Sequence, residues 1–197
     1  MKLFFVILSV FIVVACGSDP AERDEGTPIQ SRAIETMNAR EAQLLGLDKT
    51  TTGDERAWAG PRVYTMDEAQ SLAASDGKKI LLDVYTVWCG YCRKMAAETY
   101  PNQAVRSEVD AHFYTVRLDA ESDERIVFNG ESVAMKDLAT ELGVSSFPTT
   151  VFISAEGQPI GLQPGFMDAT MFSSLLGFVG SDAYRNQTFE AYVQNRN

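Results

Sequence analysis

Two cysteines that lie two residues apart, directly after an apolar run, constrain this chain more than any other feature. The run ILLDVYT (80–86) is short and contains one acid, which predicts a buried strand. Cys89 and Cys92 follow it, and residues from about 90 to 111 predict a helix that is interrupted near Pro101. The pair is therefore expected at a strand-to-helix junction, with Cys89 at the helix N-terminus. Unpaired backbone N–H groups and the helix dipole stabilise a thiolate at such a position.

A cysteine pair with this spacing can bind zinc, form a structural crosslink or carry electrons. A structural zinc site needs four ligands, and the chain adds only one histidine, His112, to this pair, so no metal site is expected. A disulfide that closes so small a loop stabilises weakly. Reversible dithiol chemistry fits the position best, with Cys89 as the nucleophile and Cys92, one turn further, as the resolving thiol. We expect the Cys89 thiol to be exposed and acidic and the Cys92 thiol to be buried.

The N-terminus predicts export. The stretch MKLFFVILSVFIVVAC (1–16) has one lysine and then an apolar segment that is too short to span a bilayer as a resident helix. Its ending, VVAC, resembles a bacterial lipobox, which predicts a signal peptide over 1–15 and a lipid on Cys16; the alternative is an ordinary signal with a free cysteine nearby. Residues 16–60 would then be the lipidated N-terminus and a tether, because GSDPAERDEGTP is polar and charged. This predicts a location on the periplasmic side of the bacterial cell envelope, anchored to a membrane, where disulfides persist.

The rest of the chain predicts an α/β domain over residues 61–180 and a helical extension over 181–197. A capping box, Thr65 with Glu68, begins a helix that Gly77 ends. The later elements are a strand over 112–119, a small hairpin inserted around Asn129-Gly130, a helix over 134–143, a hairpin of strands over 149–154 and 159–163, and a helix with Asp168 as N-cap. This order implies a mixed sheet with helices on both faces.

The stretches LLDVYTVWCGYC and SSFPTTVFI together resemble the thioredoxin superfamily, over roughly residues 62–180. WCGYC is its active-site pattern, with Tyr91 where thioredoxins usually carry proline. Asp83 occupies the place of the family's buried aspartate, and Pro148 that of the cis-proline that faces the cysteines. GKKILLDVYTVWCGYC and GFMDATMF look like the C-terminal periplasmic domain of the membrane thiol:disulfide interchange reductase. The FNGE connection and the tail GSDAYRNQTFEAY are instead similar to exported, sulfur-oxidation-associated thioredoxins.

The resemblance implies a thioredoxin fold, a mixed central sheet flanked by helices, with a small inserted hairpin and an extra C-terminal helix. On a buried strand, Asp83 would resist ionising and could accept the Cys92 proton; the alternative is an acid at a strand edge that solvent satisfies. Tyr85 could also line the substrate surface, and the alternative for Trp88 is a plain core aromatic. The expected substrate-binding residues are Trp88, Gly90, Tyr91, Phe147 and Pro148.

These expectations predict a membrane-tethered thiol–disulfide oxidoreductase that reduces disulfides of exported proteins. Its electrons would come from a membrane-embedded donor, without a cofactor, and it would act as a monomer. Three alternatives stay open: a disulfide oxidase or isomerase of the same fold, a non-catalytic holdase or assembly factor, and a dimer that holds an iron–sulfur cluster. A nucleic-acid partner is not expected, because a net charge of −10 leaves no basic stripe for phosphate binding.

Overall fold

The computed structural model describes residues 58–196. The predicted signal peptide, the lipid on Cys16 and the tether up to residue 57 lie outside these residues. Within the described range, no helix is both long enough and apolar enough to cross a membrane.

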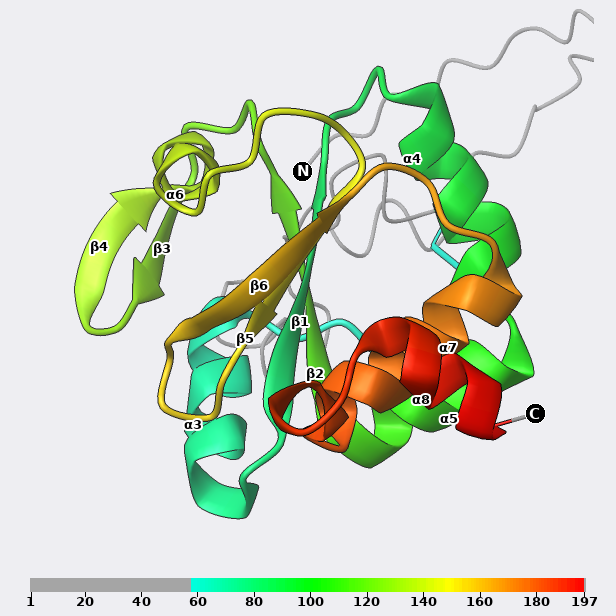
Figure 1. Ribbon diagram of the computed structural model, residues 1–197. Helices are drawn as coiled ribbons and strands as arrows, with labels where there is room; N and C mark the ends of the chain where they lie inside the picture. The colour runs from blue at the N-terminus through cyan, green and yellow to red at the C-terminus, as the bar shows by residue number, and fades with distance from the viewer. Residues whose placement is uncertain (1–57, 197) are drawn as a thin grey trace, which may run out of the picture. The chain divides into compact units, whose positions relative to one another are not determined.

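The centre of the fold is a four-stranded sheet with strand order β2-β1-β5-β6 (Figure 1). Strand β1 (Lys79–Tyr85) pairs in parallel with β2 (Phe113–Asp119) and antiparallel with β5 (Thr149–Ile153). Strand β6 (Pro159–Pro164) pairs antiparallel with β5. Every residue of β1 is buried, because helices cover both faces of the sheet. The strand is mostly apolar, and its two charged residues, Lys79 and Asp83, are each paired with an opposite charge. The predicted mixed sheet is confirmed.

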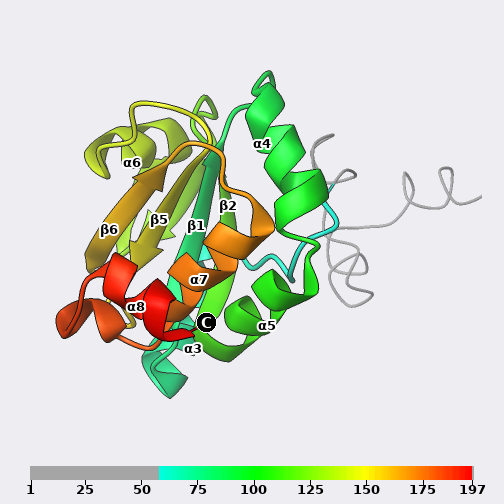
Figure 2. The same cartoon turned by 45° about the vertical axis from the view of Figure 1, so that its right-hand side comes forward.

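The two faces of the sheet carry separate cores. On one face, α3 (Met66–Asp76) and α6 (Met135–Glu141) pack against Ile80, Leu82 and Val84 of β1. On the other face, α5 (Gln103–His112) and α7 (Ala169–Gly180) pack around Leu81. Figure 2 shows α6 on one side of the sheet and α4, α5 and α7 on the other.

The predicted helix caps are present. Thr65 and Glu68 form the capping box of α3, and Gly77 ends that helix in the left-handed conformation, with φ of 80°. The Asp168 side chain accepts a hydrogen bond from Met171 N at the start of α7. These caps are local in sequence, which is why the sequence could predict them.

The inserted hairpin is also confirmed. Strands β3 (Arg125–Phe128) and β4 (Glu131–Ala134) form a separate two-stranded antiparallel sheet. Asn129 and Gly130 join them, with φ of 51° and 85°. Positive φ at both central residues is typical of the two-residue turns that close hairpins.

Two helical segments differ from the expectation. The helix after the cysteines begins as α4 (Gly90–Lys94) and continues as the π-helical segment η2 (Met95–Thr99) before the chain breaks near Pro101, as predicted. The C-terminal extension is two short helices, η3 (Ala183–Arg185) and α8 (Phe189–Arg196), where one was expected. Between them Thr188 accepts a hydrogen bond on its side chain from Ala191 N and so starts a new helix.

Candidate active site

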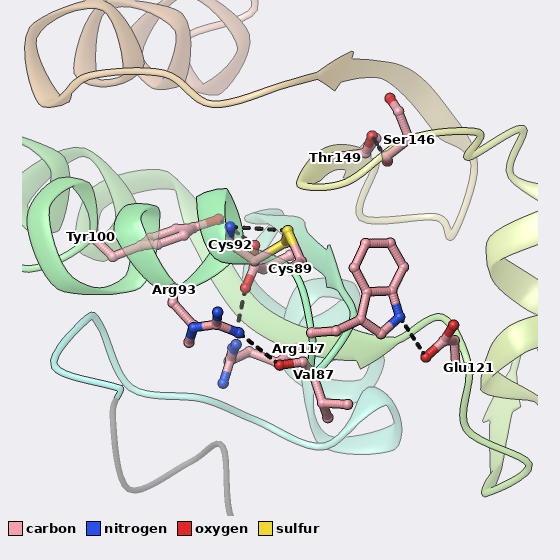
Figure 3. Close-up of a disulfide and its surroundings, with 11 residues drawn as sticks. Val87, Cys89, Cys92, Arg93, Tyr100, Arg117, Glu121, Ser146 and Thr149 are labelled. Carbon is pink, nitrogen blue, oxygen red and sulfur yellow. Dashed lines mark hydrogen bonds and ion pairs between the residues drawn. A yellow bond between two sulfur atoms is a disulfide. The ribbon is translucent and has the colours of Figure 1, made fainter.

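Cys89 and Cys92 form a disulfide at the N-terminus of α4. Cys89 is the N-cap residue, and its Sγ accepts a hydrogen bond of 3.0 Å from the backbone N–H of Cys92 (Figure 3). The N–H of Cys89 donates to Thr86 O at 3.1 Å, which closes the turn between β1 and α4. The predicted strand-to-helix junction therefore places a helix N–H group directly on the Cys89 sulfur.

Both cysteines are buried in this oxidised form, with exposed fractions of 4% for Cys89 and 6% for Cys92. The expectation of an exposed Cys89 thiol concerns the reduced form and stays a prediction. Phe147 packs against a cluster of Tyr85, Cys89 and Cys92, and so covers the disulfide. Tyr85 is buried in the same cluster, so it lies beneath the site and not on a substrate surface.

Exposed aromatic side chains surround the buried disulfide. Trp88 and Tyr91 have exposed fractions of 62% and 64%, so Trp88 is not a core residue. The Trp88 ring meets Phe147 edge to face at 6.0 Å, and its Nε1–H donates to Glu121 at 2.9 Å. The centroid of the Tyr91 ring lies 6.1 Å from that of the Phe166 ring. The site is therefore a small covered disulfide inside an apolar, aromatic rim.

The loop before β5 completes this rim. The Phe147–Pro148 peptide bond is cis, at the position where the sequence predicted it. The Thr149 hydroxyl donates to Ser146 O at 2.7 Å, and Gly165 N–H donates to Pro148 O at 2.8 Å. Figure 3 shows Ser146 and Thr149 on the side of the disulfide away from Arg93.

Gly90 is exposed at the first position of α4. A Cβ atom added there would meet only the end of the Arg93 side chain, at 4.0 Å. The backbone beside the disulfide is therefore open to a partner at this position.

Asp83 is buried, as expected, but its carboxylate is not isolated. Arg117 Nε donates to Oδ2 at 3.1 Å, and the Tyr100 hydroxyl donates to Oδ1 at 3.1 Å. The side chains of Arg117 and Asp83 are only 6% and 5% exposed. Burial disfavours the charged form of Asp83, whereas the buried cation and the hydrogen-bond donor favour it, so the protonation state of Asp83 stays a prediction.

Sequence reasoning missed Arg117 and Tyr100. Strand register places Arg117 directly beside Asp83 on β2. An arginine among the buried residues of a strand is itself a signal that an acidic partner lies nearby, because such side chains are almost never fully buried unless paired. Burial, followed by the charge of Asp83, raises the pKa of Tyr100 well above its ordinary value, so its hydroxyl stays a donor at physiological pH.

A family model described as a thioredoxin-like domain matches residues 66–180. The chain belongs to the thioredoxin-like family. The Thiol:disulfide interchange protein DsbD of Citrobacter koseri is 36% identical over 147 residues, which are 73% of this chain and 24% of that protein. The protein of the same name from Escherichia coli K12 is 32% identical over 118 residues, 58% of this chain and 19% of the relative. The chain thus spans about a quarter or less of the length of the curated relatives that it matches.

A solved structure supports the same fold. A thioredoxin-fold protein from Helicobacter pylori aligns with a TM-score of 0.56 at 21% sequence identity, over 75% of this chain and 96% of that one. The thioredoxin fold predicted from the sequence is confirmed. The Cys89–Cys92 pair in a thioredoxin-like domain supports thiol–disulfide oxidoreductase activity.

Within this thioredoxin-like domain, a line of contacts joins Asp83 to the disulfide. The Arg117 guanidinium carbon lies 4.1 Å above the Tyr85 ring, and Tyr85 packs with both cysteines. Arg93, one turn into α4, donates to Val87 O at 2.8 Å and holds the loop before Cys89. Among residues 58–196, no three His, Cys, Asp or Glu side chains are grouped so that they could hold a metal ion.

Proposed function

We propose that this protein is an exported, membrane-tethered oxidoreductase that reduces disulfides of other proteins on the periplasmic side of a bacterial envelope. One observation carries the proposal: a disulfide at a helix N-terminus, enclosed by exposed aromatic side chains and the cis-proline loop. The lipobox-like VVAC at residues 13–16 supports export and a lipid anchor on Cys16. The relatives named thiol:disulfide interchange proteins support disulfide-bearing clients and a membrane-embedded electron donor.

The reaction begins from the reduced form. The Cys89 thiolate attacks one sulfur of a client disulfide, a Cys89–client bond forms, and the other client sulfur leaves as a thiolate that takes up a proton. Cys92 then gives its proton to Asp83 and attacks Cys89 Sγ. The Cys89–Cys92 bond forms, the Cys89–client bond breaks, and the second client thiolate leaves. Two electrons have passed to the client, and the product is the disulfide seen here.

The roles of the two cysteines follow from their places on α4. Cys89 is the N-cap, and the Cys92 N–H that reaches its sulfur would stabilise a thiolate there. Cys92 lies inside the first turn, where it can attack back. A dithiol of the membrane donor reduces the pair again, so that no diffusible cofactor is required. We further propose that the protein acts as a monomer.

The surface around the cysteines suits an extended client segment. Phe147 covers the disulfide, so a client has to move or pack against this ring to reach Cys89. Trp88 and Tyr91 offer apolar contacts on either side, and Pro148 presents the backbone before β5 to the client. Gly90 leaves space for the client beside the nucleophile.

The reductive direction rests on the electrostatics of Cys89. The dipeptide between the cysteines, Gly90-Tyr91, contains no cation that would stabilise the thiolate strongly. The charge of Asp83 is offset by Arg117, so neither sign dominates beneath the site. The reduction potential is therefore expected nearer to thioredoxin's, about −270 mV, than to that of a strong oxidant, about −120 mV.

Equilibration with glutathione buffers tests the direction. A potential above roughly −180 mV would make the protein an oxidase or isomerase. Insulin reduction with a dithiol donor tests turnover: Cys89→Ser and Cys92→Ser should both abolish it, whereas a holdase would protect clients without either cysteine. The Cys92→Ser variant should also trap its client as a mixed disulfide on Cys89, and the trapped protein identifies the substrate.

A further inference from the structure

Tyr100 reaches Asp83 because of the π-helical segment. The N–H of Tyr100 donates to Met95 O at 3.1 Å, five residues back, in place of the usual four. The wider turn changes the direction in which the following residue points. Tyr100 is fully buried, and Figure 3 shows its ring extending from the helix toward Cys92. The extra residue in η2 therefore brings a hydroxyl onto the carboxylate beneath the redox site.

The residues just before the family domain seal this cluster. The Trp58 ring lies 4.5 Å from the Tyr100 ring and 4.6 Å from the Arg117 guanidinium carbon. Its Nε1–H donates to Pro61 O at 2.8 Å, which fixes the ring. A Cβ atom on Gly60 would lie 2.5 Å from Trp58 and 2.8 Å from Tyr100, so only glycine fits between them. Trp58 and Gly60 thus cover Tyr100 and Arg117, the two partners of Asp83, and help to keep water from this Asp83 cluster.

We propose that Tyr100 is a positioning residue for the resolving step, and that its hydroxyl, sealed by Trp58, holds Asp83 as an oriented carboxylate that can accept the Cys92 proton. The proposal rests on the function proposed above. A hydrogen bond inside a water-free site is stronger than one at the surface, and this one is made to the charged form. Removing the hydroxyl should therefore make Asp83 easier to protonate.

Other groups that face Asp83 come from every neighbouring strand. Arg117 lies beside it on β2, and Thr150 lies opposite it on β5, where its hydroxyl faces Tyr100. Tyr85, on β1, lies under the Arg117 guanidinium. Of the three, only Arg117 carries a charge at neutral pH, and it acts in the same direction as Tyr100. Tyr100 and Arg117 both favour the charged form of this carboxylate.

The test compares Tyr100→Phe with Tyr114→Phe. Tyr114 is a matched control, because its hydroxyl also donates to a carboxylate, Asp76, at 2.6 Å, on the face of the sheet that carries α3. The first readout is a ¹³C NMR titration of the Asp83 carboxyl, assigned with Asp83→Asn. Tyr100→Phe should raise the pKa of Asp83 by about one unit or more, since a hydrogen bond to a charged group is lost, and Tyr114→Phe should leave it unchanged.

The second readout is the pH profile of the resolving step, measured on the mixed disulfide that forms between reduced protein and glutathione disulfide. The acidic limb should move to higher pH by the same amount in Tyr100→Phe alone. An unshifted Asp83 titration, or equal shifts in both variants, overturns the proposal whatever the direction of electron flow. A shifted titration with an unshifted limb also overturns it, and shows in addition that Asp83 is not the proton acceptor.

Trp58→Leu tests the seal separately. In the wild type, added salt should hardly change the pKa of Asp83, because buried charges are screened weakly. In Trp58→Leu the pKa should become salt-dependent as water and ions reach the cluster. Equal salt dependence in wild type and variant would contradict the sealing role.

Discussion

Replacing Arg117 by Met should destabilise the protein strongly. The change removes one partner of an ion pair whose side chains are 6% and 5% exposed and leaves the Asp83 carboxylate without its cation. Breaking a buried pair in this way costs about 3–5 kcal/mol of the free energy of unfolding. The guanidinium also lies 4.1 Å from the Tyr85 ring and 4.6 Å from the Trp58 ring, and methionine replaces those contacts with apolar packing of similar reach.

The loss should depend on pH in a definite direction. Without Arg117, burial disfavours the carboxylate, so the pKa of Asp83 in the folded variant should rise above its unfolded value of about 3.9. The folded variant then binds a proton more readily than its unfolded chain does. The contribution of Asp83 to the free energy of unfolding should therefore be largest in acid and fall as the pH rises from about 4 through the raised pKa. The deficit relative to the wild type should be larger at pH 7 than at pH 4.

Urea unfolding of the oxidised protein between pH 4 and 8, followed by circular dichroism, measures this deficit. Arg185→Met is the control, because Arg185 pairs with Asp182 at the surface, where solvent screens the pair and its loss should cost much less. The double variant Asp83→Asn/Arg117→Met should recover most of the stability, since no uncompensated charge remains. A deficit below about 1 kcal/mol, one that does not vary with pH, or no recovery in the double variant would refute the reasoning.

Three further predictions concern other parts of the chain. Phe147→Ala should uncover Cys89, so that a small phosphine reduces the disulfide faster than in the wild type, and an unchanged rate would show that Phe147 does not limit access. The Tyr114 hydroxyl lowers the pKa of Asp76. Tyr114→Phe should therefore reduce the free energy of unfolding above about pH 4, and this loss should vanish below the pKa of Asp76 in the folded protein. Acid titration of the stability of both proteins measures the difference. Mass spectrometry should find an acylated Cys16 at the mature N-terminus, and Cys16→Ser should leave the membrane fraction; an unmodified terminus elsewhere would contradict the lipid anchor.

The thioredoxin fold could be predicted because its signals are local or motif-like. The capping box at Thr65, the Asn129-Gly130 turn and the N-cap at Asp168 each act within a few residues of the chain, and all three lie where the sequence predicts them. The apolar run before Cys89 likewise predicts a buried strand followed by a helix, and the structure confirms both. The sequence predicts one helix in the C-terminal extension, but a local cap at Thr188 starts a second helix, α8, after η3.

The sequence by itself determined where the redox pair lies, since a cysteine pair at a strand-to-helix junction needs only neighbouring residues to define it. Only the tertiary structure decided what surrounds the pair. Tyr100 and Arg117 lie 17 and 34 positions from Asp83, and strand register and a π-helical turn bring them together. Phe147 reaches Cys89 from a loop far along the chain. Contacts of this kind leave no periodic pattern in the sequence, because they depend on how strands and helices pack and not on the spacing of residues along either element.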